Sequence, residues 1–145
     1  MDKVKLKIER TSEDAQLPKY QYNGDSGADI CSAVDYVLKP FEIKDIPTGI
    51  KMEVPIGYEV QVRSRSGLAL NSGVVVLNSP GTVDSGYRGE IRVILMNLSQ
   101  KPYKIKIRQR IAQLVLVPVS FADFEDVSKL SATIRGANGF GSTGH

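Results

Sequence analysis

Short runs in which apolar and polar residues alternate recur along most of the chain. The opening stretch "VKLKI" places Val4, Leu6 and Ile8 on one side and lysines on the other, a period of two that is typical of a half-buried strand. Further strand candidates, rich in Val and Ile, follow at 50–54, 58–62, 74–77, 91–95, 103–107 and 114–119. Because "PIG" separates the candidates at 50–54 and 58–62, the sequence predicts a hairpin there.

Helical periodicity is confined to one segment, "SGLALNSG". Ser66 can cap its start and Gly73 can end it, and so short a helix must be held by packing. After residue 120 the alternation stops, although "SFADFEDVSKLS" can supply one short edge strand before a glycine-rich end. This pattern predicts an all-β fold (a sandwich, jelly roll or barrel) with one very short helix and a flexible C-terminal tail.

Composition narrows the class of protein. The 145 residues suit one domain that buries its own core, and the 41% hydrophobic and 24% charged fractions are ordinary for a globular chain. The net charge of +3 is spread over the strands, which argues against a dedicated nucleic-acid arm. A single cysteine, Cys31, excludes an internal disulfide, and a single histidine excludes a Cys/His zinc cluster. With no signal peptide and no apolar run long enough to span a bilayer, we expect a cytoplasmic protein.

Two segments in the first half of the chain carry clustered polar groups. "GDSGADI" contains Asp25, Ser26 and Asp29, and by itself favours a plain turn. "VRSRSGLAL" brings Arg65 and the Ser66 hydroxyl to a helix start, whose free N–H groups attract anions. A phosphate cradle and a surface strand with exposed arginines both remain open for this segment.

Two further segments follow in the second half. "NSPGTVDSGYRGEI" gathers Asp84, Tyr87 and Arg88, where a carboxylate can orient or deprotonate water and an aromatic ring can pack on a sugar or base. A hairpin with a large tip is the alternative. "RIAQL" places Arg110 and Gln113 at the entry to a very apolar strand.

The tail "RGANGFGSTG" cannot pack on its own. Ordering these ten residues costs roughly 10–20 kcal/mol. Its apolar content, Phe140 and one alanine, recovers only a few kcal/mol. The tail therefore stays disordered or is ordered by a ligand: Arg135, Ser142 and Thr143 can meet a polyanion, and Phe140 can stack on a flat ring.

Taken in chain order, these segments resemble the five motifs of the trimeric dUTP pyrophosphatases, the dUTPases. "SGADI", "RSRSGLA", "GTVDSGYRGEI", "RIAQL" and "RGANGFGSTG" carry the resemblance, which extends from about residue 26 to residue 144. Asn138 stands where the family usually has glycine, and Gly86 where an acidic residue is common. Neither departure removes a group expected to do chemistry, although Asn138 could stiffen the tail.

The resemblance implies a β jelly roll that hydrolyses dUTP to dUMP and pyrophosphate by attack of water on the α-phosphate. This reaction keeps uracil out of DNA and supplies dUMP for thymidylate synthesis. It also implies a homotrimer whose sites lie at subunit interfaces. The scattered charge and the lack of a membrane-spanning run predict no dedicated nucleic-acid binding and no membrane partner. Residues 1–134 would form the β domain, and residues 135–145 a glycine-rich lid that closes on the nucleotide.

The resemblance also implies roles for individual residues. Asp84 would activate the attacking water, Tyr87 would pack under the deoxyribose and so reject UTP, and Asp29 would help hold Mg²⁺ through water. The implied catalytic residues are Asp84, Ser66 and Gln113. The implied substrate-binding residues are Arg65, Ser66, Gly67, Asn78, Gly81, Asp84, Tyr87, Arg110, Gln113, Arg135, Phe140, Gly141, Ser142 and Thr143.

Two alternative functions stay open on the sequence alone. The related dCTP deaminases share the jelly roll, but their greater length and deaminating motif are not visible here. A regulatory module could instead keep the nucleotide pocket as a sensor. Product analysis would separate the enzymes, because one releases pyrophosphate from dUTP and the other releases ammonia from dCTP.

Overall fold

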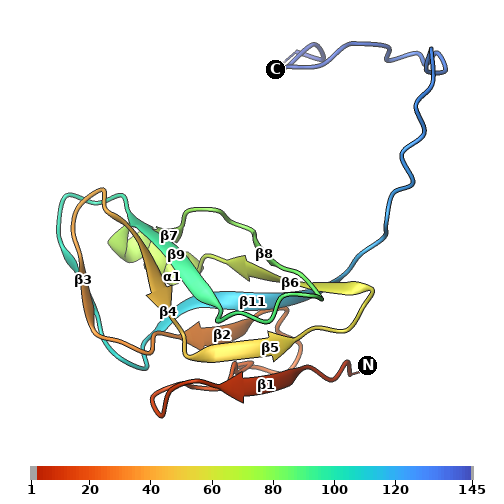
Figure 1. The fold of residues 1–145 in the computed structure, drawn as a ribbon. Coiled ribbons are helices and arrows are strands. Elements are labelled where there is room, and N and C mark those ends of the chain that lie inside the picture. Colours follow the sequence, from red (N-terminus) through yellow and green to blue (C-terminus); the bar gives the residue numbers. More distant parts are fainter. Residues whose placement is uncertain (1–2, 145) are drawn as a thin grey trace.

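The computed structural model describes residues 3–144, so Met1, Asp2 and the single histidine, His145, lie outside the described residues. This part of the chain forms eleven strands and one helix, α1 (Ser66–Ser72) (Figure 1). The strands are β1 (Lys7–Arg10), β2 (Ala28–Cys31), β3 (Tyr36–Leu38), β4 (Ile43–Pro47), β5 (Ile50–Glu53), β6 (Tyr58–Arg63), β7 (Val74–Val76), β8 (Gly81–Val83), β9 (Arg92–Asn97), β10 (Tyr103–Ile105) and β11 (Arg110–Pro118). The predicted all-β class with one short helix is confirmed.

Two antiparallel sheets enclose the core. A four-stranded sheet has the order β2-β11-β6-β8 and a three-stranded sheet has the order β4-β9-β7, while β1-β5 and β10-β3 form two further pairs. Val62 and Leu114 from the first sheet and Ile46 and Leu95 from the second belong to one buried cluster. The sheets therefore pack face to face, as in a jelly roll.

Alternation places side chains as the sequence predicts in β6. Val60 and Val62 are buried, whereas Glu59, Gln61 and Arg63 are only half-buried on the opposite face. The same alternation defines β11, which is longer than predicted and lies between β2 and β6. β11 pairs with both β2 and β6, so its side chains lie beside those of both strands. Gln113 of β11, for example, lies opposite Asp29 on β2 and Arg63 on β6.

The predicted hairpin over 50–62 is wrong. A turn does form, since the Tyr58 N–H donates to the Pro55 carbonyl over 3.2 Å and Gly57 has a φ of 92°. However, β5 pairs with β1, whereas β6 pairs with β11 and β8. The turn reverses the direction of the chain. Burial of the apolar faces of β5 and β6, however, decides which strands each of them pairs with, so this turn connects two different sheets.

Four strands were not predicted, and β2 lies where the sequence favoured a turn. Only Ala28 and Ile30 of β2 are buried, and two positions are too few to show a period of two. The helix also starts differently, because Arg65 occupies the N-cap without a side-chain cap bond and Ser66 is the first helical residue. Gly73 ends the helix in the left-handed conformation, as predicted, and buried Leu68 holds the helix to the body.

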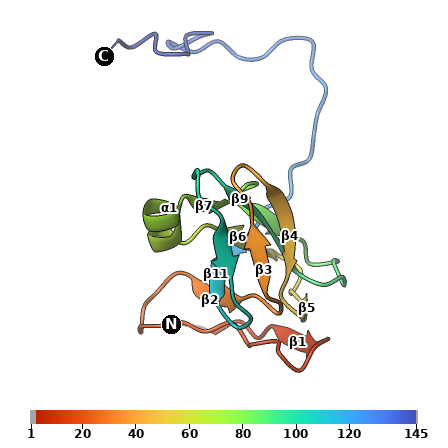
Figure 2. The same ribbon diagram turned by 90° about the vertical axis from the view of Figure 1, so that its left-hand side faces the viewer.

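The predicted edge strand after residue 120 is absent from the described chain. Residues 120–138 are exposed and contain no strand, and Figures 1 and 2 show the segment 119–144, here called the arm, leading away from the body. Its last backbone hydrogen bond to the body runs from the Val119 N–H to the Gly57 carbonyl, 2.9 Å. Phe121 and Phe124 are 80% and 93% exposed, so no sheet edge of the same chain receives this segment.

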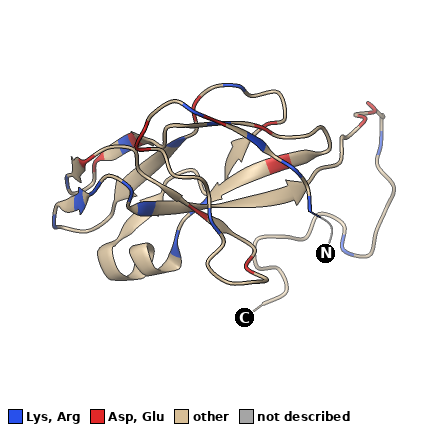
Figure 3. Cartoon of the chain, turned by 90° about the horizontal axis from the view of Figure 1, so that it is seen from below, with Lys and Arg blue, Asp and Glu red and all other residues tan. Residues whose placement is uncertain are grey.

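Charges of both signs are mixed over the molecule, as Figure 3 shows for the strands and loops seen from below. In the described part of the chain, no helix is long and apolar enough to serve as a transmembrane span.

Candidate active site

One carboxylate holds two arginines at the edge of the four-stranded sheet. The Arg65 Nε donates to Asp29 Oδ1 over 2.9 Å, and the Arg110 Nη1 donates to Asp29 Oδ2 over 3.2 Å. The Asp29 side chain is only 12% exposed, so these charge-assisted bonds are partly shielded from water. We call these three residues the Asp29 clamp, which fixes two guanidinium groups side by side and carries one net positive charge.

A bulge in β11 brings the clamp and Gln113 together. Arg110 and Gln113 are three residues apart, so strict alternation would place them on opposite faces. The register with β2 shifts between Arg110 and Ala112, and Ile111 and Ala112 are both buried in succession. The bulge therefore turns both polar side chains toward Asp29, which pairs with Gln113 across the strands.

The Gln113 carboxamide is held by backbone on two sides. Its Nε2 donates to the Ser64 carbonyl over 2.9 Å. A β-carbon at Gly27 would lie 2.9 Å from the Gln113 Cδ and closer still to Oε1, so any other residue there would force this amide to move. The glycine of "SGADI" thus has a packing role that the sequence did not reveal.

Ser66 and Gly67 stand at the exposed start of α1, beside Arg65. Because Ser66 is the first helical residue rather than the cap, its N–H and that of Gly67 have no intrahelical partner. The Ser64 Oγ accepts a hydrogen bond from the Val76 N–H, 2.8 Å, and ties this corner to β7. Free donors therefore lie next to the two arginines of the clamp.

A cavity of about 240 Å³ lies on the other side of β6, next to β8. Asn78, Gly81, Thr82 and Tyr87 contribute to its wall, together with apolar side chains such as Ile91. A β-carbon at Gly81 would lie 3.2 Å from the Asn78 Nδ2 and 3.3 Å from the Val62 Cβ, so the wall is tightly packed there. The peptide bond between Ser79 and Pro80, in the loop before β8, is cis.

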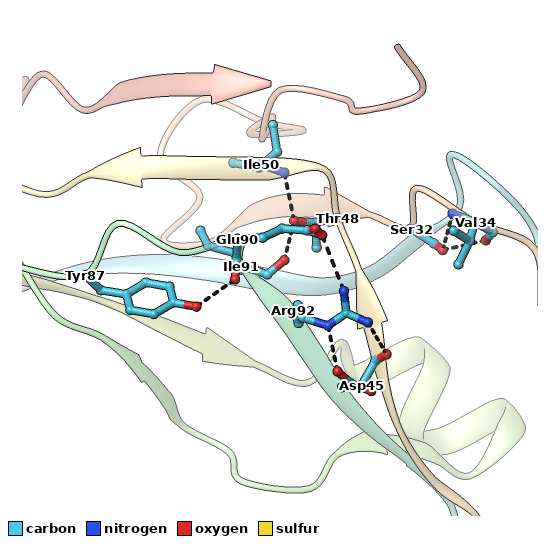
Figure 4. A network of polar contacts seen from close by, with 9 residues as sticks. All are labelled: Ser32, Val34, Asp45, Thr48, Ile50, Tyr87, Glu90, Ile91 and Arg92. Carbon is cyan, nitrogen blue, oxygen red and sulfur yellow. Dashed lines mark hydrogen bonds and ion pairs between the residues drawn. The ribbon is translucent and has the colours of Figure 1, made fainter. Parts of the chain in front are cut away.

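The loop after β8 is folded on itself. The Tyr87 N–H donates to the Asp84 carbonyl over 3.1 Å. The Tyr87 hydroxyl donates to the Glu90 carbonyl over 2.9 Å (Figure 4). The Arg88 Nη1 donates to the carbonyls of Ser85, 2.8 Å, and Tyr87, 3.0 Å. Asp84 is exposed at the start of this loop.

Three charged residues border the same cavity and were not predicted. The Arg92 Nε donates to Asp45 Oδ2 over 2.6 Å, and its Nη1 lies 3.5 Å from Glu90 Oε1 (Figure 4). The hydrogen bond from Arg92 holds the pKa of Asp45 below its usual value. Glu90 belongs to the quoted third segment, but no motif connects Asp45 with Arg92, because they meet only through the register of β4 and β9.

The predicted residues therefore fall into two groups within one chain. Asp29, Arg65, Arg110 and Gln113 meet at the clamp, whereas Asn78, Gly81 and Tyr87 line the cavity. Between the two groups, the Ser64 N–H donates to the Ser79 Oγ over 3.4 Å. Across residues 3–144, no hydrogen bond or ion pair joins the side chain of Asp84 to the clamp.

The tail residues join neither group. Arg135, Phe140, Gly141, Ser142 and Thr143 all lie on the arm (Figure 1). The Arg135 Nε donates to the Asn138 carbonyl over 3.0 Å, so its bond is internal to the arm. The Phe140 ring is fully exposed.

Asp29 is the one carboxylate of the clamp, and among residues 3–144 no three His, Cys, Asp or Glu side chains converge on a metal position. Both of its oxygens accept guanidinium bonds, yet each keeps a second lone pair that can accept from water. Such a site cannot enclose a bare cation, but it fits a hydrated one. Mg²⁺ suits this arrangement, because it keeps several waters and binds phosphate oxygens.

Comparison with known proteins identifies close relatives. A model of the dUTPase family matches residues 13–144. Deoxyuridine 5'-triphosphate nucleotidohydrolase of Nautilia profundicola is 51% identical over 141 residues, which cover 97% of this chain and 99% of that protein. The protein of the same name from Helicobacter pylori strain Shi470 is 50% identical, with 97% of each chain covered.

Solved structures agree with these relatives. The dUTPase of Staphylococcus bacteriophage 80alpha, with dUPNHPP, has a TM-score of 0.90 and 29% identity and covers 97% of this chain and 99% of that chain. A mutant dUTPase of phage phi11 of S. aureus, whose structure shows the coordination of a structural Mg(II) ion, has a TM-score of 0.83 and 26% identity, covering 89% of this chain and all of that one. The match over nearly the whole length establishes that this chain belongs to the dUTPase family.

Proposed function

We propose that this chain hydrolyses dUTP to dUMP and pyrophosphate. The observation that carries the proposal is the cavity beside β8, whose wall includes Tyr87 and the tightly packed Gly81. Exposed Asp84 directly follows β8 in the chain. The Asp29 clamp supplies the positive charge that a triphosphate needs. In the cytoplasm, the reaction would keep uracil out of DNA and provide dUMP for thymidylate synthesis.

Uracil would be read by backbone groups of β8 and of the loop that begins at Asn78. β8 is the outermost strand of its sheet, so one edge of the strand keeps N–H and C=O groups that no described strand uses. A fixed donor and acceptor pattern rejects cytosine, because its reversed pattern would leave buried groups without partners. The close packing of Gly81 on Asn78 leaves little room for the methyl group of thymine.

Asp84 would orient the attacking water and accept its proton. Water oxygen forms the new bond to the α-phosphorus, the bond from that phosphorus to the bridging oxygen breaks, and pyrophosphate leaves. Arg65 and Arg110 would stabilise the charge on the departing phosphates, with the free N–H groups of Ser66 and Gly67 and the Ser66 hydroxyl beside them. Gln113, fixed between Ser64 and Gly27, would support the phosphate side.

Mg²⁺ bound to the triphosphate would neutralise part of its charge and align its oxygens. Asp29 would hold one of the waters on that ion through the lone pairs that the arginines leave free.

The arm supports a homotrimer whose sites combine several chains. Phe121, Phe124, Leu130, Ile134 and Phe140 are all more than 79% exposed, which an isolated soluble chain would not favour. A neighbouring copy offers the surface that the chain's own body does not. Residues 135–145 would then close as a lid, with Arg135, Gly141, Ser142 and Thr143 on the phosphates and Phe140 on the uracil, over a body formed by residues 1–134.

Pyrophosphate release from dUTP, UTP, dCTP and dTTP with Mg²⁺ tests the proposal. We expect release from dUTP alone at low enzyme concentration. Ammonia from dCTP, without pyrophosphate from dUTP, would identify a deaminase instead. Binding of dUTP without any turnover would identify a sensor.

A further inference from the structure

The ring of Tyr87 rests directly on the α-carbon of Gly89. A β-carbon at Gly89 would lie 2.5 Å from the Tyr87 Cζ and 3.0 Å from Cε2, and nearer still to the hydroxyl oxygen. Carbon atoms in contact stay about 3.5–4.0 Å apart, so no side chain fits between the ring and the backbone. Gly89 does not have a positive φ, so the position needs glycine for its space and not for its backbone conformation.

A hydrogen bond fixes the same ring from its far end. The Tyr87 hydroxyl donates to the Glu90 carbonyl over 2.9 Å, as Figure 4 shows. The chain immediately after Glu90 is anchored in the body: the Ile91 N–H donates to the Ile50 carbonyl over 2.8 Å, and the Ile91 carbonyl accepts from the Thr48 hydroxyl. Ile91 is only 2% exposed, so the carbonyl that holds the ring belongs to a rigid segment.

The rest of the ring is partly exposed. Tyr87 is 46% exposed and forms part of the cavity wall. The distance between the Tyr87 ring and Gly89 therefore determines how far the ring extends into the cavity, and so how much space remains for a sugar. This consequence rests on the proposed function, in which the deoxyribose packs on Tyr87.

We propose that Gly89 is a positioning residue for sugar selectivity, acting through Tyr87. Any β-carbon at this position would displace the ring by about 1 Å and break its bond to Glu90. A ring displaced into the cavity would obstruct the deoxyribose, and a ring displaced out of it would make room for a 2′-hydroxyl. Displacement out of the cavity lowers the preference for dUTP over UTP, whereas displacement into the cavity lowers kcat/KM for dUTP and cannot favour the bulkier UTP.

The test compares Gly89→Ala with a matched control in the same loop, Gly86→Ala. A β-carbon at Gly86 meets no heavy atom within 4 Å, and Gly86 does not have a positive φ. A second variant, Tyr87→Phe, keeps the ring and its glycine floor but removes the bond to Glu90. For each protein, kcat and KM are measured with dUTP and with UTP, together with the melting temperature and the affinity for dUPNHPP.

We expect Gly89→Ala to lower kcat/KM for dUTP by about 10- to 100-fold and to change the dUTP-to-UTP ratio of kcat/KM, because a misplacement of about 1 Å has effects of this size. Gly86→Ala should keep the ratio of the unmodified protein, and Tyr87→Phe should change it by a smaller factor. An unchanged ratio in Gly89→Ala, or an equal loss in Gly86→Ala, overturns the inference. If Gly89→Ala does not fold, Tyr87→Phe provides the test instead. An unchanged dUTP-to-UTP ratio of kcat/KM in Tyr87→Phe also overturns the inference. Failure of the proposed function is distinct, since the unmodified protein would then not hydrolyse dUTP at all.

Discussion

At the scale of single residues, two aspartates of the candidate site have opposite surroundings. Asp29 is nearly buried and gives both oxygens to guanidinium groups, so its negative charge serves to hold Arg65 and Arg110. Asp84 is exposed, and within residues 3–144 its carboxylate has no hydrogen-bond partner. The carboxylate of Asp84 is therefore free to contact a water, whereas both oxygens of Asp29 already accept guanidinium bonds.

Replacing Asp84 by Asn should remove turnover and leave binding intact. The amide has the same shape but cannot accept a proton from water, and a general base contributes about 10²–10⁴-fold to a rate. We expect kcat for dUTP to fall by about 10³-fold, with the affinity for dUPNHPP within a few-fold of the unmodified protein. Stopped-flow pyrophosphate release and calorimetric titration measure the two quantities. Turnover at the unmodified rate would refute the role assigned to Asp84.

At the scale of elements, strands with a long alternation of apolar and polar residues could be predicted from the sequence, whereas very short strands and irregularities in strand pairing could not. β6 could be predicted because Val60 and Val62 alternate with three polar residues, whereas β2 offers only two buried positions. The motif segments pointed to Asp29, Arg110 and Gln113, but not to the bulge in β11 that turns Arg110 and Gln113 toward Asp29. A bulge depends on the pairing of β11 with β2, so no local pattern reports it.

The glycines of the site illustrate the same limit. Gly27 lies under Gln113 and Gly89 lies under Tyr87, and both requirements come from contacts that fold geometry creates. A glycine in a loop is ordinarily explained by backbone freedom. Neither of these glycines has a positive φ, so only the coordinates show that space is the reason.

The turn between β3 and β4 should make stability depend on pH. The Tyr36 hydroxyl donates to the Glu42 carboxylate, which also accepts from the Lys39 N–H over 2.9 Å. The hydrogen bond from Tyr36, followed by that from Lys39, lowers the pKa of Glu42 in the folded protein. A lowered folded pKa stabilises the fold above the unfolded pKa of about 4.3, and this stabilisation is lost as the pH falls through the folded pKa.

Replacing Tyr36 by Phe should therefore lower the melting temperature at pH 7. The difference from the unmodified protein should shrink as the pH falls through the lowered pKa of Glu42 in the folded protein, because Glu42 is then protonated in both proteins. Thermal unfolding followed by circular dichroism between pH 3 and 7 measures this. A difference that stays constant over the range would show that packing, and not the bond to Glu42, is what the substitution removes.

The last element of the chain, the tail, should be needed for activity and not for folding. A chain that ends at Ile134 loses only residues that make no hydrogen bond to the body within residues 3–144. We expect its melting temperature without nucleotide to be unchanged and its kcat/KM for dUTP to fall by about 10²-fold or more, because a lid excludes water and positions phosphates. Full activity of the shortened chain would rule out the lid.

At the scale of the whole molecule, one chain holds all the pieces of the site but does not assemble them. The clamp and the cavity form separate groups, and the arm carries Arg135 and Phe140 away from both (Figure 2). In the proposed homotrimer, the exposed phenylalanines along the arm would pack on another copy. A closed ring of three copies would give every arm an equivalent place to bind.

Mixing two inactive variants tests whether a site takes its tail from another chain. Asp84→Asn keeps the tail and lacks the base, and the chain ending at Ile134 keeps Asp84 and lacks the tail. If the chains exchange after unfolding and refolding together in equal amounts, about one quarter of the sites should combine an intact Asp84 with an intact tail, since each occurs with a probability of about one half. Activity should then rise well above that of either variant refolded alone. If each tail closed over its own chain, no mixed assembly could contain a complete site, and the activity would not recover even where light scattering shows assemblies of three chains.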